Sequence, residues 1–141
     1  MTIVGAGPTG LCCALWLVRA GIRVTVLERE HGLPEDLRAS TFHPATLDLL
    51  KASGIADQLV GEGTRAPRWQ YWRHGTEKRS VFDLDLIAGE TNYPLRLQCE
   101  QVRLTYAIAC ELRDHPLFAL HRGCRVTAVR PEADGVALEY E

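Results

Sequence analysis

The amino-acid sequence predicts an α/β fold that begins with a parallel βαβ unit and carries an inserted antiparallel β layer. Two observations lead to this prediction. The first 28 residues form a short apolar strand, a glycine-rich turn, an amphipathic helix and a second apolar strand. After about residue 66 the helical period of the apolar residues gives way to strict alternation, which is typical of antiparallel strands.

The glycine-rich turn reads Gly-Ala-Gly-Pro-Thr-Gly and directly follows the first strand. Gly5 allows a tight strand-to-helix turn because a residue without Cβ can adopt a positive φ. Gly7 lets the backbone approach a pyrophosphate, and Gly10 lets the helix lie close to the strands. Pro8 suits the first turn of a helix, where no N–H is needed. Since the free N–H groups at a helix start attract anions, the turn predicts a Rossmann-like dinucleotide site.

Glu28 ends the second strand, which we expect over residues 23–28, and lies 18 residues after Gly10. A carboxylate at about this offset accepts a hydrogen bond from a ribose 2′-hydroxyl. A ribose 2′-phosphate would be repelled there. The pattern therefore favours a nucleotide with free ribose hydroxyls, although by itself it does not separate FAD from NAD.

The remaining elements follow from periodicity and from turn residues. In the hairpin expected at 69–73 with 80–84, Trp69 and Tyr71 share one strand face and Trp72 takes the other. We expect core packing for these residues, and a border on a cavity or a subunit contact is the alternative for one of the two faces. No parallel strand follows the last alternating pair, so we expect an incomplete domain, the amino-terminal part of a larger protein. The expected elements are a helix over 10–20, a loop over 30–36, helices over 45–52 and 55–60, a linker over 61–66, a hairpin of 69–73 with 80–84, a helix over 101–113, a strand over 117–120 and a strand pair of 124–130 with 136–140.

Composition narrows the class of protein. With 46% hydrophobic and 24% charged residues and a net charge of −2, the chain reads as a soluble globular protein without a nucleic-acid partner. The longest apolar stretch, Leu11 to Val18, is too short to span a membrane. The five cysteines show no CxxC spacing, and the adjacent Cys12 and Cys13 read as small core residues. We therefore expect a cytoplasmic protein with reduced thiols and no metal site.

Four segments, spread over nearly the whole chain, carry a resemblance to a known family. They are Val4–Leu11, Val26–Arg29, Arg38–Leu50 and Leu97–Leu104. These segments resemble the flavoprotein aromatic hydroxylases, the FAD monooxygenases typified by p-hydroxybenzoate and phenol hydroxylases. In that family the corresponding segments are a Gly-Pro-Ser/Thr-Gly turn, a strand that ends in Glu-Arg, an arginine before a small-residue loop and a leucine-rich helix, and a glutamine at a helix start.

The resemblance implies that the cofactor is FAD and assigns residues to it. Arg38 could otherwise be a solvated surface arginine, and Gln101 a plain helix-start residue. The implied contacts are the pyrophosphate for Gly5, Gly7, Pro8, Thr9 and Gly10, the adenosine ribose for Glu28, the adenine end for Arg29, the pyrophosphate or flavin side for Arg38, the ribityl–phosphate region for Gln101 and the adenine for Val126.

The function that the resemblance implies is hydroxylation of a small aromatic, phenolic substrate with NAD(P)H and O₂. Residues 1–141 would then be the amino-terminal part of an FAD-binding domain, with about 66–98 contributing strands to a substrate-side β layer. We expect the isolated chain to be inactive and assign no catalytic side chain in it. Two alternatives stay open: an FAD- or NAD-dependent oxidoreductase of another family, and a non-catalytic nucleotide-binding module. The sequence also leaves open whether the protein forms a homo-oligomer.

Overall fold

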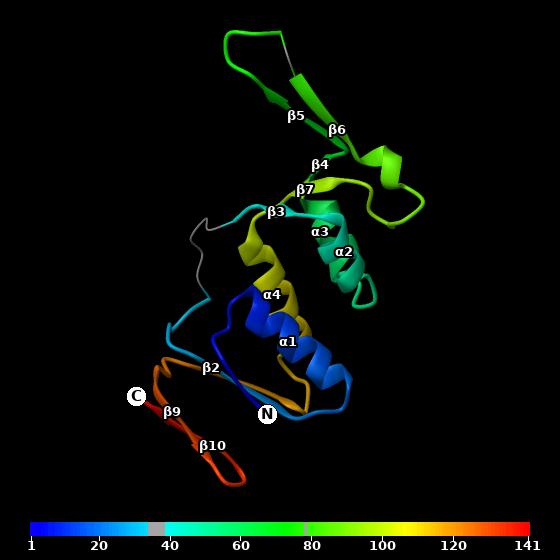
Figure 1. The fold of residues 1–141 in the computed structure, drawn as a ribbon. Helices are drawn as coiled ribbons and strands as arrows, with labels where there is room; N and C mark the ends of the chain where they lie inside the picture. Colours follow the sequence, from blue (N-terminus) through cyan, green and yellow to red (C-terminus); the bar gives the residue numbers. More distant parts are fainter. Residues whose placement is uncertain (34–38, 78) are drawn as a thin grey trace. The chain divides into compact units, whose positions relative to one another are not determined.

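A computed structural model describes residues 1–33, 39–77 and 79–141 of the chain. The chain divides into two compact units. The first combines Met1–Asp36 with Leu104–Glu141, and the second comprises Leu37–Arg103. Figure 1 traces the elements of both along the chain.

A three-stranded parallel sheet forms the centre of the first unit. The strands β1 (Thr2–Val4), β2 (Val24–Glu28) and β8 (Phe118–Arg122) lie in the order β1-β2-β8, and both pairings are parallel. Because β2 is the central strand, all its residues except the half-buried Thr25 are buried, as expected for a strand covered on both faces. The predicted βαβ unit is confirmed, and the strand expected over 117–120 is β8, which extends its sheet.

The helix α1 (Pro8–Arg19) connects β1 to β2. Its buried residues, Leu11, Ala14, Leu15 and Val18, follow the helical period that the sequence predicts. The helix begins two residues earlier than expected because proline is well suited to its first position. It ends where Gly21 adopts φ +77° and donates its N–H to the carbonyl of Val18.

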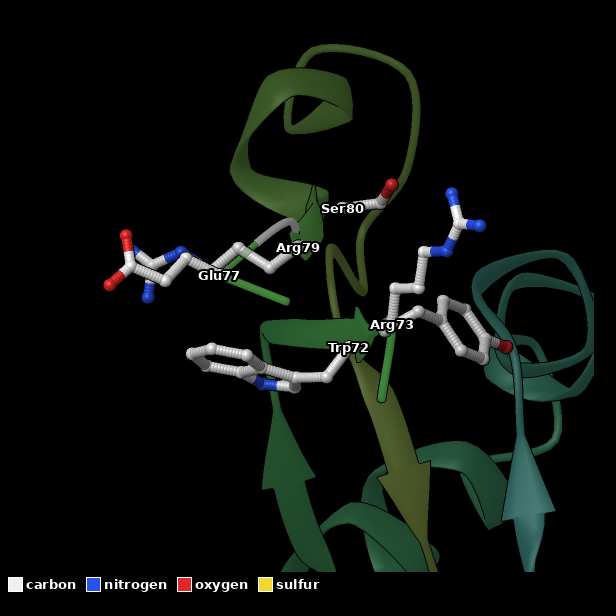
Figure 2. A pocket seen from close by; sticks show the side chains of 6 residues that line it. Trp72, Arg73, Glu77, Arg79 and Ser80 are labelled. Atoms are coloured by element: carbon white, nitrogen blue, oxygen red, sulfur yellow. The ribbon is translucent and has the colours of Figure 1, made fainter. Parts of the chain in front are cut away.

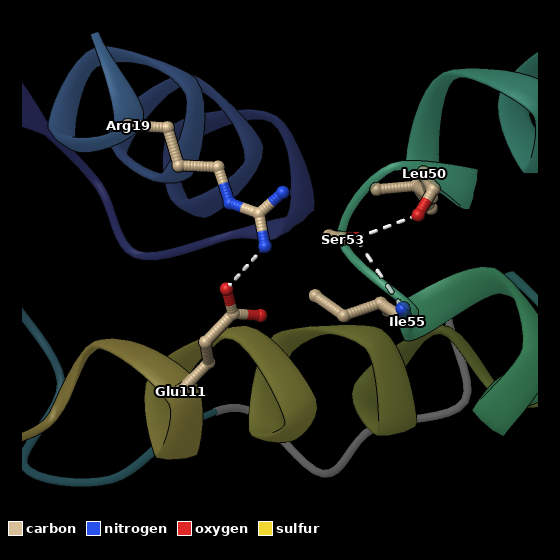
Figure 3. Close-up of polar contacts among 5 residues, drawn as sticks. All are labelled: Arg19, Leu50, Ser53, Ile55 and Glu111. Atoms are coloured by element: carbon tan, nitrogen blue, oxygen red, sulfur yellow. Dashed lines mark hydrogen bonds and ion pairs between the residues drawn. The ribbon is translucent and has the colours of Figure 1, made fainter.

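The helix α4 (Gln101–Leu112) and a β-hairpin complete the first unit. Glu111 of α4 forms an ion pair with Arg19 of α1, with 2.7 Å between Oε1 and Nη2 (Figure 3). The antiparallel hairpin consists of β9 (Val126–Glu132) and β10 (Gly135–Tyr140), as the alternating pattern predicts.

The second unit is built on a small antiparallel sheet. Its strands β3 (Thr41–Phe42), β7 (Arg96–Gln98) and β4 (Thr64–Ala66) lie in the order β3-β7-β4. The helices α2 (Pro44–Lys51) and α3 (Ile55–Glu62) pair with each other in this unit. The buried side chains of the unit include Phe42, Leu47, Leu50, Ile55, Leu59 and Leu97.

The turn between α2 and α3 is held by a single hydroxyl. The Oγ of Ser53 donates to the carbonyl of Leu50 at 2.6 Å and accepts from the N–H of Ile55 at 3.3 Å (Figure 3). The following Gly54 adopts φ +77° before the first residue of α3. The break that the sequence predicts between the helices expected over 45–52 and 55–60 is therefore confirmed.

The predicted hairpin in the second unit is confirmed as β5 (Arg68–Trp72) and β6 (Arg79–Asp83), which are followed by the 3₁₀ helix η1 (Leu84–Ile87). The expectation of core packing is wrong for two of its aromatic residues, since Tyr71 is 64% exposed and Trp72 is 58% exposed. A two-stranded ribbon has no second layer to cover its faces. Trp69 is half-buried and stacks on Phe82, with 5.2 Å between the ring centroids.

Other sequence predictions also fail. The expected linker over 61–66 is instead the end of α3, then Gly63, then β4. A Cβ on Gly63 would lie 2.8 Å from the carbonyl oxygen of Gln98, so glycine is needed for the close approach to β7. Cys13 is exposed rather than in the core.

Among the described residues, no helix has the length and apolar character needed to cross a membrane.

Candidate functional site

The glycine turn between β1 and α1 has the geometry that its sequence predicts. Gly5 adopts φ +99° and donates its N–H to the carbonyl of Leu27 in β2, at 2.8 Å. A Cβ on Gly10 would lie only 2.1 Å from the carbonyl oxygen of Gly5 and 3.4 Å from a side-chain methyl of Ile3. Glycine at position 10 therefore permits the close contact between the first turn of α1 and the end of β1.

The start of α1 forms an open, anion-attracting cradle. Gly7 is the N-cap residue of the helix, and a Cβ added to it would meet no atom within 4 Å. The Leu11 N–H donates to the Gly7 carbonyl, which closes the first helical turn. Within the described part of the chain no acceptor pairs with the N–H groups of Thr9 and Gly10. These free N–H groups lie at the positive end of the helix dipole, where a phosphate group binds most readily.

Glu28 reaches back to this cradle from the end of β2. Its side chain is only 6% exposed. One carboxylate oxygen accepts from the backbone N–H of Ala6 at 2.6 Å, and the other accepts from the N–H of Glu30 at 3.0 Å. The carboxylate is thus fixed beside the glycine turn, and each oxygen keeps a lone pair for a further donor.

The role of Ala6 was missed by sequence reasoning, which assigned Glu28 to the ribose alone. The donor is a backbone group, so no side-chain type marks it in the sequence. Its bond to Glu28 couples the glycine turn to the carboxylate at the end of β2.

Two further predicted site residues lie near the end of β2. The guanidinium of Arg29 is exposed, and its Nε lies 3.1 Å from a carboxylate oxygen of Glu30. The Cys124 N–H donates to the Glu28 carbonyl at 2.8 Å, two residues before the half-buried Val126 that begins β9. The structure therefore brings the segment that leads into β9 beside Glu28, where the resemblance places the adenosine end of the cofactor.

Gln101, in contrast, belongs to the second unit, where it is the first residue of α4. Gln101 is half-buried, and its backbone N–H donates to the carbonyl of Ala39 at 3.0 Å. Arg38, the other residue expected to contact the flavin side, lies outside the described residues.

The same end of α4 is held by an ion pair. Nη1 of Arg103 lies 2.9 Å from a carboxylate oxygen of Glu62 in α3. Hydrogen bonds from Gln58 and Arg103 lower the pKa of the Glu62 carboxyl, so the pair stays ionised at neutral pH. The interaction fixes the helix start from which Gln101 projects.

One hollow lies on the surface of the β5–β6 hairpin and contains none of the predicted site residues. It measures about 700 Å³ and is lined by Tyr71, Trp72, Arg73, Glu77, Arg79 and Ser80. Figure 2 shows Trp72 and Arg79 on one side of the hairpin and Arg73 on the other. The guanidinium carbon of Arg79 lies 5.6 Å from the Trp72 ring centroid. In the described part of the chain, no three His, Cys, Asp or Glu side chains are grouped so that they could hold a metal ion.

Comparison with known proteins shows the family to which this chain belongs. The family model described as "FAD binding domain" matches residues 1–141. This chain belongs to that family. Gly7, Gly10 and Glu28 all lie within the residues that this family model matches.

Similar proteins that the comparisons found support this family assignment. The chain is 32% identical to para-nitrophenol 4-monooxygenase from Pseudomonas sp. strain WBC-3 over 140 residues, which cover 99% of the chain and 34% of that protein. It matches the crystal structure of p-nitrophenol 4-monooxygenase from Pseudomonas putida DLL-E4 with a TM-score of 0.84 and 30% identity, over 97% of the chain and 37% of that structure.

A third match is to a structure described as a ternary complex of aklavinone-11 hydroxylase with FAD and aklavinone. It has a TM-score of 0.68 and 27% identity, over 99% of the chain and 30% of that structure. The chain therefore spans about a third of the length of these relatives. The matches confirm the resemblance to the flavoprotein aromatic hydroxylases and the predicted α/β fold.

Proposed function

We propose that this chain is the amino-terminal part of the FAD-binding domain of an FAD-dependent monooxygenase that hydroxylates a small aromatic, phenolic substrate with NAD(P)H and O₂. The observation that carries the proposal is the cradle itself, which combines an open Gly7, unpaired N–H groups at the helix start and a buried Glu28. Two of the three matched relatives are named as p-nitrophenol 4-monooxygenases, and these names support the choice of reaction.

The described residues would divide the cofactor between them. The N–H groups of Thr9 and Gly10 would bind the pyrophosphate, with Gly5, Gly7 and Pro8 shaping the turn around it. Glu28 would accept hydrogen bonds from the adenosine ribose. Arg29 and Val126 would lie at the adenine end, and Gln101 would contact the ribityl–phosphate region. Arg38 remains assigned to the pyrophosphate or flavin side from the sequence alone.

Bound FAD would supply the redox chemistry. The residues of this chain bind and orient it. The fixed carboxylate of Glu28 selects a ribose with free hydroxyls, because a 2′-phosphate would face a buried negative charge. The preformed N–H groups at the helix start bind the pyrophosphate without reorganising the backbone. The chain therefore determines which nucleotide binds and in which direction it lies.

The substrate side is proposed for the second unit. Residues 66–98 include β5, β6 and β7, and we propose that they contribute strands to a substrate-side β layer. Since the chain covers about a third of its relatives, we propose that the isolated chain binds the cofactor without turnover. We further propose a cytoplasmic location with reduced thiols, in keeping with the five free cysteines.

The direct test is nucleotide binding by the purified 141-residue chain. We expect a flavin band in the visible spectrum after incubation with FAD and gel filtration. We also expect 5′-ADP to compete with FAD at least ten times more strongly than 2′,5′-ADP, because the 2′-phosphate meets Glu28. Binding of 5′-ADP without FAD would favour a non-catalytic nucleotide-binding module. Failure to bind any of these nucleotides would contradict the proposed function.

A further inference from the structure

The strand β8 forms one edge of the parallel sheet in the first unit. In the described part of the chain it pairs with β2 alone. The Leu117 carbonyl accepts from the N–H of Val24 in β2, so the odd-numbered residues of β8 direct their backbone groups toward β2. The even-numbered residues direct theirs outward. Among the described residues, the N–H and carbonyl of Leu120 and the N–H of Arg122 have no hydrogen-bond partner. A free edge of this kind can pair with a further strand.

A groove of about 600 Å³ lies between this edge and the helix α4. Tyr106 and Cys110, four positions apart on one face of α4, line one wall. Three successive residues of β8, Phe118, Ala119 and Leu120, line the other. Because the side chains of successive residues point to opposite faces of a sheet, a hollow lined by all three lies along the edge of the strand. A groove between an edge strand and a helix is the place where PDZ and PTB domains add an extended peptide to their sheets.

Two arginine side chains, those of Arg113 and Arg122, also line the groove. Among the described residues, no carboxylate oxygen lies within 4 Å of either guanidinium. Arg113 donates to the Sγ of Cys110 at 3.7 Å, which is a weak acceptor. Arg113 lies in the loop that leads into Phe118, and Arg122 ends the strand, about 13 Å further along it at 3.3 Å per residue. Positive charge at both ends favours an acidic occupant, and the edge of a second copy would bring the same charges together.

We propose that the groove between β8 and α4 binds an extended acidic segment of a partner protein, which adds to the parallel sheet as a further strand. Main-chain hydrogen bonds to Leu120 and Arg122 would hold the segment, and the two guanidiniums would select acidic side chains about four residues apart. An apolar residue between these acids would cover the half-buried side chains of Phe118 and Leu120. The groove contains none of the predicted cofactor-binding residues, so this proposal does not depend on FAD.

The test is an NMR titration of the nitrogen-15-labelled 141-residue chain with the peptide acetyl-Glu-Thr-Ile-Thr-Glu-amide. We expect the amide signals of Leu120 and Arg122 to shift until the site is saturated. Arg113→Gln and Arg122→Gln should each raise the Kd about threefold, and a peptide with lysine in place of both glutamates should raise it about tenfold or more. The matched control is Arg125→Gln, which removes a guanidinium that pairs with Glu141 outside the groove and should leave the Kd unchanged.

Backbone methylation of the peptide separates strand addition from simple charge attraction. Successive residues of an extended peptide direct their N–H groups to opposite sides, so methyl groups on the isoleucine nitrogen and on a neighbouring threonine nitrogen block opposite edges of the peptide. We expect one of these two peptides to bind about tenfold more weakly and the other to bind as the parent peptide does. Equal affinities of the two methylated peptides would overturn the addition of a strand.

Other outcomes would also overturn the proposal. One is the absence of binding, or shifts confined to residues outside the groove. Another is equal binding of the glutamate and lysine peptides, which would remove the role of the arginines. A dimer of the free chain in sedimentation equilibrium that the peptide dissociates would assign the edge to a second copy. Binding to the 141-residue chain but not to the longer enzyme proposed above would assign the groove to a segment of the same protein.

Discussion

Two alanine substitutions separate the packing of the cradle from its chemistry. Gly10→Ala tests the packing, and Gly7→Ala tests the binding of the pyrophosphate. A Cβ at position 10 would lie 2.1 Å from the carbonyl oxygen of Gly5, whereas carbon–oxygen contacts normally begin at about 3.3 Å. The helix start and the turn must therefore separate by roughly 1 Å. Both partners are backbone, so neither can rotate away.

The expected cost of Gly10→Ala follows from this contact. Overpacking in a well-packed core costs about 1–3 kcal/mol, and a clash between two backbone segments belongs at the upper end or beyond. With a urea m-value of about 2 kcal/mol per molar, a loss of about 3 kcal/mol lowers the unfolding midpoint by about 1.5 M. Gly7 has φ −71° and open space around its Cβ position, so Gly7→Ala should cost about 1 kcal/mol or less, the price of a poorer N-cap.

The assay combines urea unfolding followed by circular dichroism with FAD binding followed by visible absorbance. We expect Gly10→Ala to lower the unfolding midpoint strongly. We expect Gly7→Ala to keep nearly the wild-type midpoint and to lose FAD, because its methyl group occupies the approach to the pyrophosphate. A wild-type midpoint for Gly10→Ala would refute the packing argument. Wild-type FAD binding by Gly7→Ala would refute the assignment of the cradle to the pyrophosphate.

Two further predictions concern the charge at Glu28 and the ionisation of Tyr93. Glu28→Gln is expected to weaken FAD binding about tenfold in a fluorescence titration, because it replaces a charge-assisted acceptor by a neutral one. The control Glu30→Gln should have little effect. Equal FAD affinities of the wild type and Glu28→Gln would contradict the ribose contact. Burial and a 2.7 Å hydrogen bond to Asp57 raise the pKa of Tyr93 from 10.0 to about 12. Since the folded state then holds the proton more tightly, the stability from this group is present below pH 10 and is lost between pH 10 and 12, by up to about 2–3 kcal/mol. Urea unfolding at pH 9 and pH 11.5 measures this loss, and an equal loss in Tyr93→Phe would show that another group causes it.

The first unit could be predicted from the sequence because its signals are local. The positive φ of Gly5, the period of Leu11 and Leu15 along α1 and the position of Glu28 at the end of β2 each depend on residues close in the chain. Local signals of this kind survive in a single sequence because sterics and side-chain periodicity act within one or two turns.

The second unit was harder to predict because its sheet is made of very short, distant strands. The strands β3 and β7 contain two and three residues, too few for any periodicity to appear. The requirement for glycine at position 63 arises only because β7 passes 2.8 Å from where a Cβ would lie. The exposure of Tyr71 and Trp72 likewise depends on which layers cover the hairpin, and alternation in the sequence cannot supply that information.

The βαβ unit and its dinucleotide turn could be predicted from the sequence alone, because glycine sterics and apolar periodicity are properties of neighbouring residues. Other contacts depend on long-range packing within each unit. In the first unit the backbone N–H of Ala6 holds the Glu28 carboxylate across 22 residues of sequence separation. In the second unit the Arg96 guanidinium lies 5.8 Å from the Trp69 ring centroid. Such contacts depend on how distant segments pack, since a hydrogen bond to the backbone leaves no mark on residue type.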